Sequence, residues 1–479
     1  MSSIAPISVS RRSIVVDLDG ALILTDLLHE SALSLIAASP IKALGQLPSL
    51  FRGDVPLKER LAELAELDTR TIPLNTRLLG WLEEQRRQGA EIYLASKSAE
   101  RYVAAIAKHL GIFDGVFIWG RSSDRPGRHD ATELTSVFGE RGFDYVGDGS
   151  VKTEVLRNAD RIYLVGSRPD RASALKTSFP DAEVLPTEPA TFHDYVRLLR
   201  VHQWLKNALV FVPALAGHNF SIEAFLACIA AFFGFSFCAS GVYVLNDLLD
   251  LRSDRMHPTK KNRPLASGKI SIAHGLLLVP LTMALAIAFS LLLPWEFFQV
   301  LCVYYALTLA YSLHLKRQTS LDVVVLAMLY GVRILAGSTA THDIISPWLL
   351  AFSLFLFSSL AFVKRCSELE ARLRAGGSEP IGRGYVMSDL QVLSALAASS
   401  GLLSVLTVTL YINSISALNL YSKPQYLLFI PIILMYWICN ILIITHRGQM
   451  NEDPVLYAAK DYRSWTCGGL IMFAAILST

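Results

Sequence analysis

A succession of long apolar runs is the feature that most constrains how this chain can fold. From about residue 207 to the chain end we count nine runs close to the ~20 residues that a helix needs to cross a membrane. The hydrocarbon core offers no water to exposed backbone groups, so such runs predict helices packed as a bundle. The nine expected spans are approximately 207–219, 222–245, 272–291, 295–313, 320–340, 347–364, 389–411, 425–445 and 464–479.

The loops between these runs indicate how the bundle is oriented. Lysine and arginine gather in the loops after the second, fourth, sixth and eighth runs, whereas the opposite connections hold almost none apart from Lys423. Basic loops stay on the cytoplasmic side of a membrane. The first twenty residues lack a long apolar core before a cleavage site, so we expect no signal peptide. We therefore expect a multi-pass integral membrane protein whose N-terminal region is cytoplasmic.

The first 195 residues have a different pattern. The segments SIVVDL, EIYLAS, FDYVG and RIYLVG predict short strands, and SAERYVAAIAKHLGI predicts a helix between two of them. Strands and helices in alternation predict a parallel sheet with helices on both faces. The expected fold is thus an N-terminal α/β domain, residues 1–195, fused to an all-α polytopic membrane bundle of about nine helices, residues 196–479.

Net charge and cysteine positions give no sign of a nucleic-acid partner, a cysteine metal site or a disulfide framework. The net charge of +3 is too small to imply a nucleic-acid partner. The six cysteines all lie in or beside apolar runs, without metal-ligand spacing or a disulfide framework, and we interpret them as small buried apolar residues.

The segment NDLLDLRSDRMHPTKKNRPLASGKI, residues 246–270, places opposed charges at the end of an apolar run. Asp247, Asp250 and Asp254 are spaced i, i+3 and i+7, which puts them on one face of a helix. Three carboxylates there repel one another unless a divalent cation binds, and carboxylate oxygens suit Mg²⁺. The residues proposed to add an amide ligand or to hold phosphates are Asn246, Lys260, Lys261 and Arg263. The alternative is a solvated loop with ordinary salt bridges.

The motif NDLLDLRSD resembles the N-D-x-x-D-x-x-x-D pattern of the UbiA-like superfamily of intramembrane prenyltransferases. Further stretches resemble one branch of it, the polyprenyl-phosphate phosphoribosyltransferases: HQWLKNALVFVPALAG, MHPTKKNRPLASGKI, YSLHLKRQTSLDVVVLAMLYGVRILAGS, FVKRCSELE and RGQMNEDPVLYAAKD. The resemblance covers about residues 197–479. It implies a nine-helix bundle in a bacterial inner membrane, with Mg²⁺ as cofactor.

The branch resemblance implies a reaction and its substrates. A 5-phosphoribosyl group would move from 5-phosphoribosyl diphosphate to a polyprenyl phosphate, a membrane lipid, and supply a lipid-linked pentose for D-arabinose in the cell envelope or on nodulation signals. Asp247, Asp250 and Asp254 would hold the metal, and Asp322 would ligate a second site, orient Lys316 or hold a sugar hydroxyl. The other expected substrate-binding residues are Gln203 and Lys206 for the lipid phosphate, Lys364 and Arg365 for the ribose 5-phosphate, and Lys260, Lys261, Arg263 and Lys316 for further phosphates.

Two alternative functions remain open at this point. One is a prenyltransferase with an aromatic acceptor, but the loop LHLKRQTSLDV holds a single aspartate where such enzymes usually carry a second aspartate-rich motif. The other is a non-enzymatic membrane protein, in which the basic residues only set topology. That alternative leaves the helical aspartate triad unexplained.

The N-terminal segment VVDLDGALILTD resembles the haloacid dehalogenase-like phosphatases over about residues 12–170. The resemblance implies that Asp17 attacks phosphorus, Asp19 acts as acid and base, Ser96 binds phosphate and Asp148 ligates Mg²⁺. The chain departs from that family in three places: Ala21 replaces a threonine, Lys152 replaces a second acidic residue, and GRSSDRPGRHDATE offers Arg121, Arg125 and Arg128 instead of a lysine. These departures favour a domain kept for folding or regulation; the competing hypothesis is a phosphatase that removes the 5-phosphate from the transferase product.

Overall fold

The structure is a computed structural model of all 479 residues, and it describes the chain except for residues 1–11, 40–56, 120–127, 167–168, 375–383 and 451–452. The chain forms two compact units. The first contains residues 1–199 and 244–278, and the second contains residues 200–243 and 279–479. Each unit is described by itself.

The first unit is built on a six-stranded sheet in the order β3-β2-β1-β4-β5-β6, with every pairing parallel. The four strands expected from sequence are confirmed. Sequence patterning did not mark the other two strands, β3 and β6, which have four and two residues. The strands are β1 (Ser13–Asp17), β2 (Glu91–Ser96), β3 (Gly115–Ile118), β4 (Phe143–Gly147), β5 (Ile162–Leu164) and β6 (Glu183–Val184).

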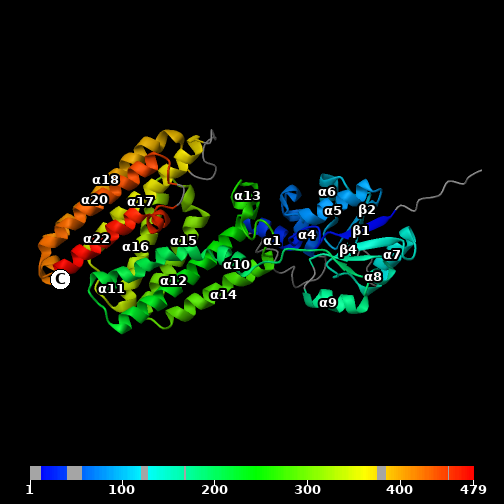
Figure 1. Ribbon diagram of the computed structural model, residues 1–479, viewed down its shortest axis with the longest axis horizontal. Helices are drawn as coiled ribbons and strands as arrows, with labels where there is room; N and C mark the ends of the chain where they lie inside the picture. Colours follow the sequence, from blue (N-terminus) through cyan, green and yellow to red (C-terminus); the bar gives the residue numbers. More distant parts are fainter. Residues whose placement is uncertain (1–11, 40–56, 120–127, 167–168, 375–383, 451–452) are drawn as a thin grey trace, which may run out of the picture. The chain divides into compact units, whose positions relative to one another are not determined.

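Helices cover both faces of this sheet (Figure 1). Ile14 and Val16 of β1 pack in one core with α5 and α6, whereas Val15 points into a second core with α7 and α8. The expected helix is α6, which ends at Gly111 in the left-handed conformation, φ +64°. The helices are α1 (Leu27–Ala38), α4 (Leu57–Leu64), α5 (Thr76–Arg87), α6 (Glu100–Leu110), α7 (Arg128–Phe138), α8 (Thr153–Asn158), α9 (Pro169–Ser178) and α10 (Phe192–Leu198), with a 3₁₀ turn η1 (Thr69–Thr71).

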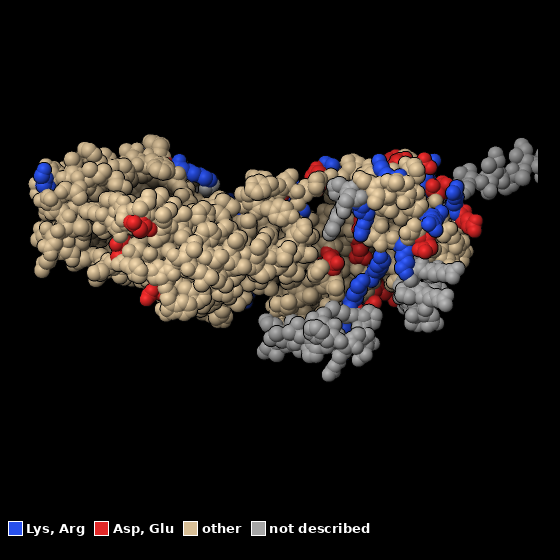
Figure 2. Space-filling model, turned by 90° about the horizontal axis from the view of Figure 1, so that it is seen from below, with Lys and Arg blue, Asp and Glu red and all other residues tan. Residues whose placement is uncertain are grey.

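Seven helices in the described residues are long and apolar enough to cross a membrane. They are α12 (Ile222–Leu249), α14 (Ile272–Ser290), α15 (Trp295–Leu313), α16 (Leu321–Thr341), α17 (Pro347–Arg374), α18 (Leu390–Ile412) with η5 (Met387–Asp389), and α20 (Phe429–His446) with η6 (Pro424–Leu428). The helices differ in how deeply they are buried. In the most apolar 18-residue stretch of α16, 61% is buried, whereas in that of α15 only 22% is buried. Many large apolar side chains of these helices are exposed, and the face of the molecule drawn in Figure 2 shows few Lys, Arg, Asp or Glu over its left part.

Two of the nine expected spans are not among the seven long apolar helices, so the count of nine is not confirmed. The run 207–219 folds as the 3₁₀ helix η2 (Val201–Phe211) followed by α11 (Val212–Ala216), which has a proline in its first turn. The run 464–479 lies in α22 (Tyr462–Ser478), 17 residues long. The remaining elements are α13 (Leu251–Met256), η3 (Lys260–Asn262), η4 (Leu315–Arg317), α19 (Ile415–Leu420) and α21 (Pro454–Lys460).

Candidate active site

The aspartates of NDLLDLRSD lie where α12 ends and α13 begins. Asp247 is in the last turn of α12, Asp254 is in α13, and Asp250 is the residue between the two helices. The hydrogen bonds from Asp250 N to Asn246 O and from Asp254 N to Asp250 O, both 2.9 Å, continue the helical pattern through this break. The backbone therefore keeps close to the helical register that the spacing predicts.

Two of the three carboxylates converge on one cation. Nη1 of Arg263 lies 3.0 Å from Asp247 Oδ1 and 2.5 Å from Asp254 Oδ2. Asp247 and Asp254 are buried, with 3% and 1% of their surface exposed, and Nζ of Lys260 lies 4.0 Å from Asp254. A carboxylate pair at this depth needs a positive charge beside it, and the guanidinium supplies one.

The donor chemistry of this cluster fits Mg²⁺, which is usually held by one or two carboxylates together with substrate phosphates. Asp247 and Asp254 already place oxygens around one shared cation position. The described residues contain no group of three or more His, Cys, Asp or Glu side chains arranged for a metal, so Asp250 stays a predicted ligand. In the same segment Asn246 is half-buried and Lys261 is exposed.

A second polar cluster lies in the other unit, around Asp453 at the start of α21. Oδ2 of Asp453 accepts hydrogen bonds from Nζ of Lys206, at 2.7 Å, and from Nζ of Lys364, at 3.0 Å. Burial of the Asp453 carboxyl opposes ionisation, but the two lysine charges and their hydrogen bonds outweigh it and hold its pKa well below the ordinary value. One carboxylate thus sits between two cations.

Arg333 of α16 belongs to the same unit and was not singled out from the sequence. Only 5% of it is exposed, and it donates to neutral groups: Asn207 Oδ1 at 2.8 Å, the carbonyl of Leu329, and Tyr304 OH at 3.0 Å. Both Arg333 and Lys206 lie against the ring of Tyr330. The sequence did contain a signal for Arg333, because an arginine inside an apolar run usually marks a functional group.

The expected site residues Asp322 and Arg365 form a buried pair. Nε of Arg365 lies 2.8 Å from Asp322 Oδ2, and Tyr385 OH donates to Asp322 Oδ1 at 2.5 Å. Arg365 also contacts Glu368 at 2.6 Å. Lys316, in η4, and Gln203, in η2, are half-buried, and their proposed substrate contacts stay predictions.

In the first unit, the four residues expected for a phosphatase gather at the carboxyl ends of β1, β2 and β4. Ser96 Oγ donates to Asp19 at 2.7 Å, and Tyr145 OH donates to Asp17 at 3.1 Å. A Cβ on Gly20, where φ is +77°, would lie 3.1 Å from Asp148 Oδ2. Burial, with repulsion from Asp19 and Asp148, raises the pKa of Asp17 to about 8. This grouping occurs at the edge where open parallel sheets bind ligands.

Lys97 is a basic residue at this edge that the sequence analysis overlooked. Its backbone N–H donates to Asp19 at 3.2 Å and its Nζ donates to Ser150 O at 3.2 Å. Its charge favours the ionised form of Asp17. The candidate substitutes Arg121 and Arg125 lie outside the described residues, and Lys152 lies just before α8. The clue to Lys97 in the sequence was that it directly follows Ser96.

Comparison with known sequences decides the family. The profile of the UbiA prenyltransferase family matches residues 208–457, more than half of the chain. The chain belongs to the UbiA prenyltransferase family. With its seven candidate spans, it is a multi-pass integral membrane protein and a transferase of that family.

Individual relatives refine this comparison. The protein y4nM of Sinorhizobium fredii is 34% identical over 97% of this chain and 90% of its own length. The nodulation protein NoeC of Azorhizobium caulinodans is 35% identical over 58% of this chain and 90% of its own. The decaprenyl-phosphate phosphoribosyltransferase of Mycolicibacterium smegmatis is 32% identical over 43% of this chain and 66% of its own.

Among solved structures, a UbiA homolog from Archaeoglobus fulgidus bound to GPP and Mg²⁺ matches with 18% identity and a TM-score of 0.46. The match covers 59% of this chain and 99% of that one.

Proposed function

We propose that this UbiA-family protein transfers the 5-phosphoribosyl group of 5-phosphoribosyl diphosphate to a polyprenyl phosphate. The observation that carries the proposal is a group of three cations in the second unit, two of them buried and one half-buried, beside the carboxylate of Asp453. Lys206 and Lys364 share the carboxylate of Asp453, and buried Arg333 donates its hydrogen bonds to neutral groups. Such a cluster suits a ligand with phosphate groups. Relatives named decaprenyl-phosphate phosphoribosyltransferase support the choice of substrates.

In the proposed reaction, the bond between the anomeric carbon of the ribose and the diphosphate oxygen breaks, and a phosphate oxygen of the lipid forms the new bond. Diphosphate leaves with the electron pair. Mg²⁺, when bound, neutralises charge on the diphosphate. Asp247 and Asp254 would hold the metal, with Asp250 as a third ligand, while Arg263 and Lys260 would bind phosphate oxygens. No covalent enzyme intermediate is needed, so catalysis consists of positioning and charge stabilisation.

We further propose that residues 1–195 form a cytoplasmic haloacid dehalogenase-like domain, that residues 196–479 form the transferase domain, and that the protein resides in a bacterial inner membrane. A lipid-linked pentose made there would serve as the precursor of D-arabinose units. Similarity to a nodulation protein supports a role in nodulation signals, and similarity to the mycobacterial enzyme supports a role in the cell envelope.

The proposed function is tested by asking which of two diphosphate donors the protein uses. Membranes containing the protein receive Mg²⁺ and either labelled 5-phosphoribosyl diphosphate with polyprenyl phosphate, or a labelled allylic diphosphate with an aromatic acceptor. We expect label in the extracted lipid with the first pair alone. Product from the second pair alone would replace the proposal with an aromatic prenyltransferase, and no product from either would favour a non-enzymatic protein.

Lys206 provides a sharper prediction about the lipid. Lys206→Met removes one of two cations from Asp453, and we expect the KM for polyprenyl phosphate to rise about tenfold with little change in kcat, since a hydrogen bond to a charged group is worth about 1.5–3 kcal/mol. Steady-state kinetics with varied lipid and saturating donor measure this. Lys423→Met, at an exposed lysine, is the matched control. A rise in the KM of the diphosphate donor instead would reassign Lys206 to that substrate.

A second candidate function is phosphomonoester hydrolysis by the sheet domain, favoured by the gathering of Asp17, Asp19, Ser96 and Asp148 at one sheet edge. If this site is active, wild-type membranes release the 5-phosphate of the lipid product as inorganic phosphate, and Asp17→Asn retains it. The change is nearly isosteric, so transfer itself should continue. Thin-layer chromatography of the labelled lipid, before and after treatment with an added phosphatase, separates the two products. If wild type and Asp17→Asn give identical lipids, the sheet domain does not hydrolyse the 5-phosphate.

A further inference from the structure

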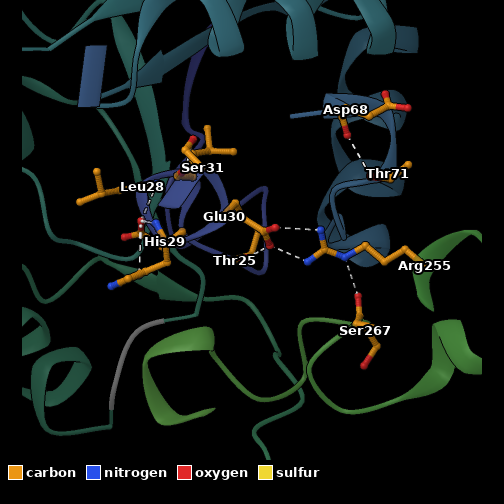
Figure 3. Close-up of polar contacts among 12 residues, drawn as sticks. Thr25, Leu28, His29, Glu30, Ser31, Asp68, Thr71, Arg255 and Ser267 are labelled. Carbon is orange, nitrogen blue, oxygen red and sulfur yellow. Dashed lines mark hydrogen bonds and ion pairs between the residues drawn. The ribbon is translucent and has the colours of Figure 1, made fainter. Parts of the chain in front are cut away.

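A buried ion pair joins the sheet domain to the segment that carries the aspartate cluster (Figure 3). Glu30, in the first turn of α1, faces Arg255 of α13, and only 3% and 6% of the two side chains are exposed. Nη2 of Arg255 lies 2.5 Å from Oε1 and Nη1 lies 3.1 Å from Oε2 of Glu30. This two-point geometry fixes the orientation of the guanidinium as well as its position.

Both ends of the pair are held by further bonds. Thr25 Oγ1 donates to Glu30 Oε1 at 2.6 Å, and Arg255 Nε donates to the carbonyl of Ala266 at 3.0 Å. Arg255 therefore ties α13 to a point eleven residues later in the chain. Arg263 lies inside that closed turn, and Asp254 is the residue before Arg255. The bonds of Arg255 thus close the turn that holds Asp254 against Arg263.

Two other contacts anchor the same segment on the sheet domain. Lys269 Nζ lies 3.2 Å from the buried carboxylate of Asp194. Gly268 has φ +75°, and a Cβ there would lie 2.6 Å from Cβ and 2.9 Å from the carbonyl oxygen of Leu24. A partly open pocket of about 250 Å³ lies beside Glu30 and Arg255. The polar contacts hold the segment against the sheet domain at this point.

We propose that Glu30 and Arg255 are positioning residues for the Asp247–Asp254 carboxylate pair, so that the sheet domain is a required part of the metal and diphosphate site. This inference rests on the proposed function of the carboxylates. Without Glu30, Arg255 is a buried cation lacking its carboxylate, and α13 moves to bring it to water. Asp254 moves with α13 and leaves Arg263.

The test uses purified full-length protein, with Mn²⁺ as the probe. We expect Glu30→Gln to weaken Mn²⁺ binding, measured by electron paramagnetic resonance, about tenfold, the usual scale for residues that orient metal ligands. The KM for the diphosphate donor should rise in parallel, per mole of folded protein. The matched control is Arg77→Gln, which breaks the exposed ion pair of Arg77 and Glu188 in the same domain. Wild-type Mn²⁺ affinity in Glu30→Gln would overturn the inference.

A double variant separates positioning from stability alone. Glu30→Gln with Arg255→Met removes both charges, so that no buried charge is left unpaired and thermal stability should recover. If Glu30 and Arg255 act as positioning residues, the double variant should still bind Mn²⁺ about tenfold more weakly than wild type, because the Arg255 guanidinium no longer links Glu30 to Ala266. Recovery of wild-type binding would overturn the inference. If wild type fails to transfer phosphoribose, the proposed function fails, but the Mn²⁺ measurements still decide this point.

Discussion

Replacing Asp247 by asparagine is expected to abolish transfer while the protein remains folded in the membrane. The substitution keeps the size of a side chain that is 3% exposed and removes its charge. Loss of a preorganised contact to charge developing in a transition state costs on the order of 10²–10³ in kcat. The measurement is incorporation of labelled phosphoribose into extractable lipid, per mole of protein, at several Mg²⁺ concentrations. Chelation of the metal should also stop wild-type transfer, and added Mg²⁺ should restore it.

The matched control for this prediction is Asp26→Asn. Asp26 is an exposed carboxylate that caps α1 through the N–H groups of Leu28 and His29, and asparagine caps equally well. The control should therefore retain full activity. Full activity in Asp247→Asn at limiting Mg²⁺ would show that the carboxylate pair serves only to neutralise Arg263.

Replacing Asp322 by alanine is expected to destabilise the membrane bundle by about 3 kcal/mol, because it removes the buried carboxylate partner of a buried arginine and leaves only the partly exposed Glu368. Arg365 is 1% exposed, and its Nε lies 2.8 Å from Asp322. The substitution also removes the acceptor of the Tyr385 hydroxyl, at 2.5 Å. Thermal unfolding of the purified protein in detergent measures the effect as a lower midpoint temperature.

Glu368→Ala is the matched control, because Glu368 is the other carboxylate bound to Arg365 and 35% of its side chain is exposed. An ion pair that water reaches contributes about 1 kcal/mol or less, so this variant should unfold close to wild type. The competing role for Asp322, as a ligand to metal or sugar, predicts a different result. Under that role, Asp322→Asn would unfold at the wild-type temperature but lose transfer.

Local patterns were enough to predict most of the architecture. Strand and helix periodicities depend on neighbouring residues, so they marked β1, β2, β4, β5 and α6. Length and hydropathy marked the seven confirmed spans. The spacing of Asp247 and Asp254 likewise encodes their convergence, since residues seven apart share a helix face. The family followed from the same short motif, which is contiguous in the chain.

Tertiary structure alone decided the pairings between distant residues. Lys206 and Asp453 are 247 residues apart, and Glu30 and Arg255 are 225 apart, so no local pattern links either pair. The charges of these residues are visible in the sequence, but each is compatible with a surface position. Burial is what makes a partner obligatory, because an unpaired charge away from water is too costly to persist. The identity of that partner depends on how the helices and the sheet pack.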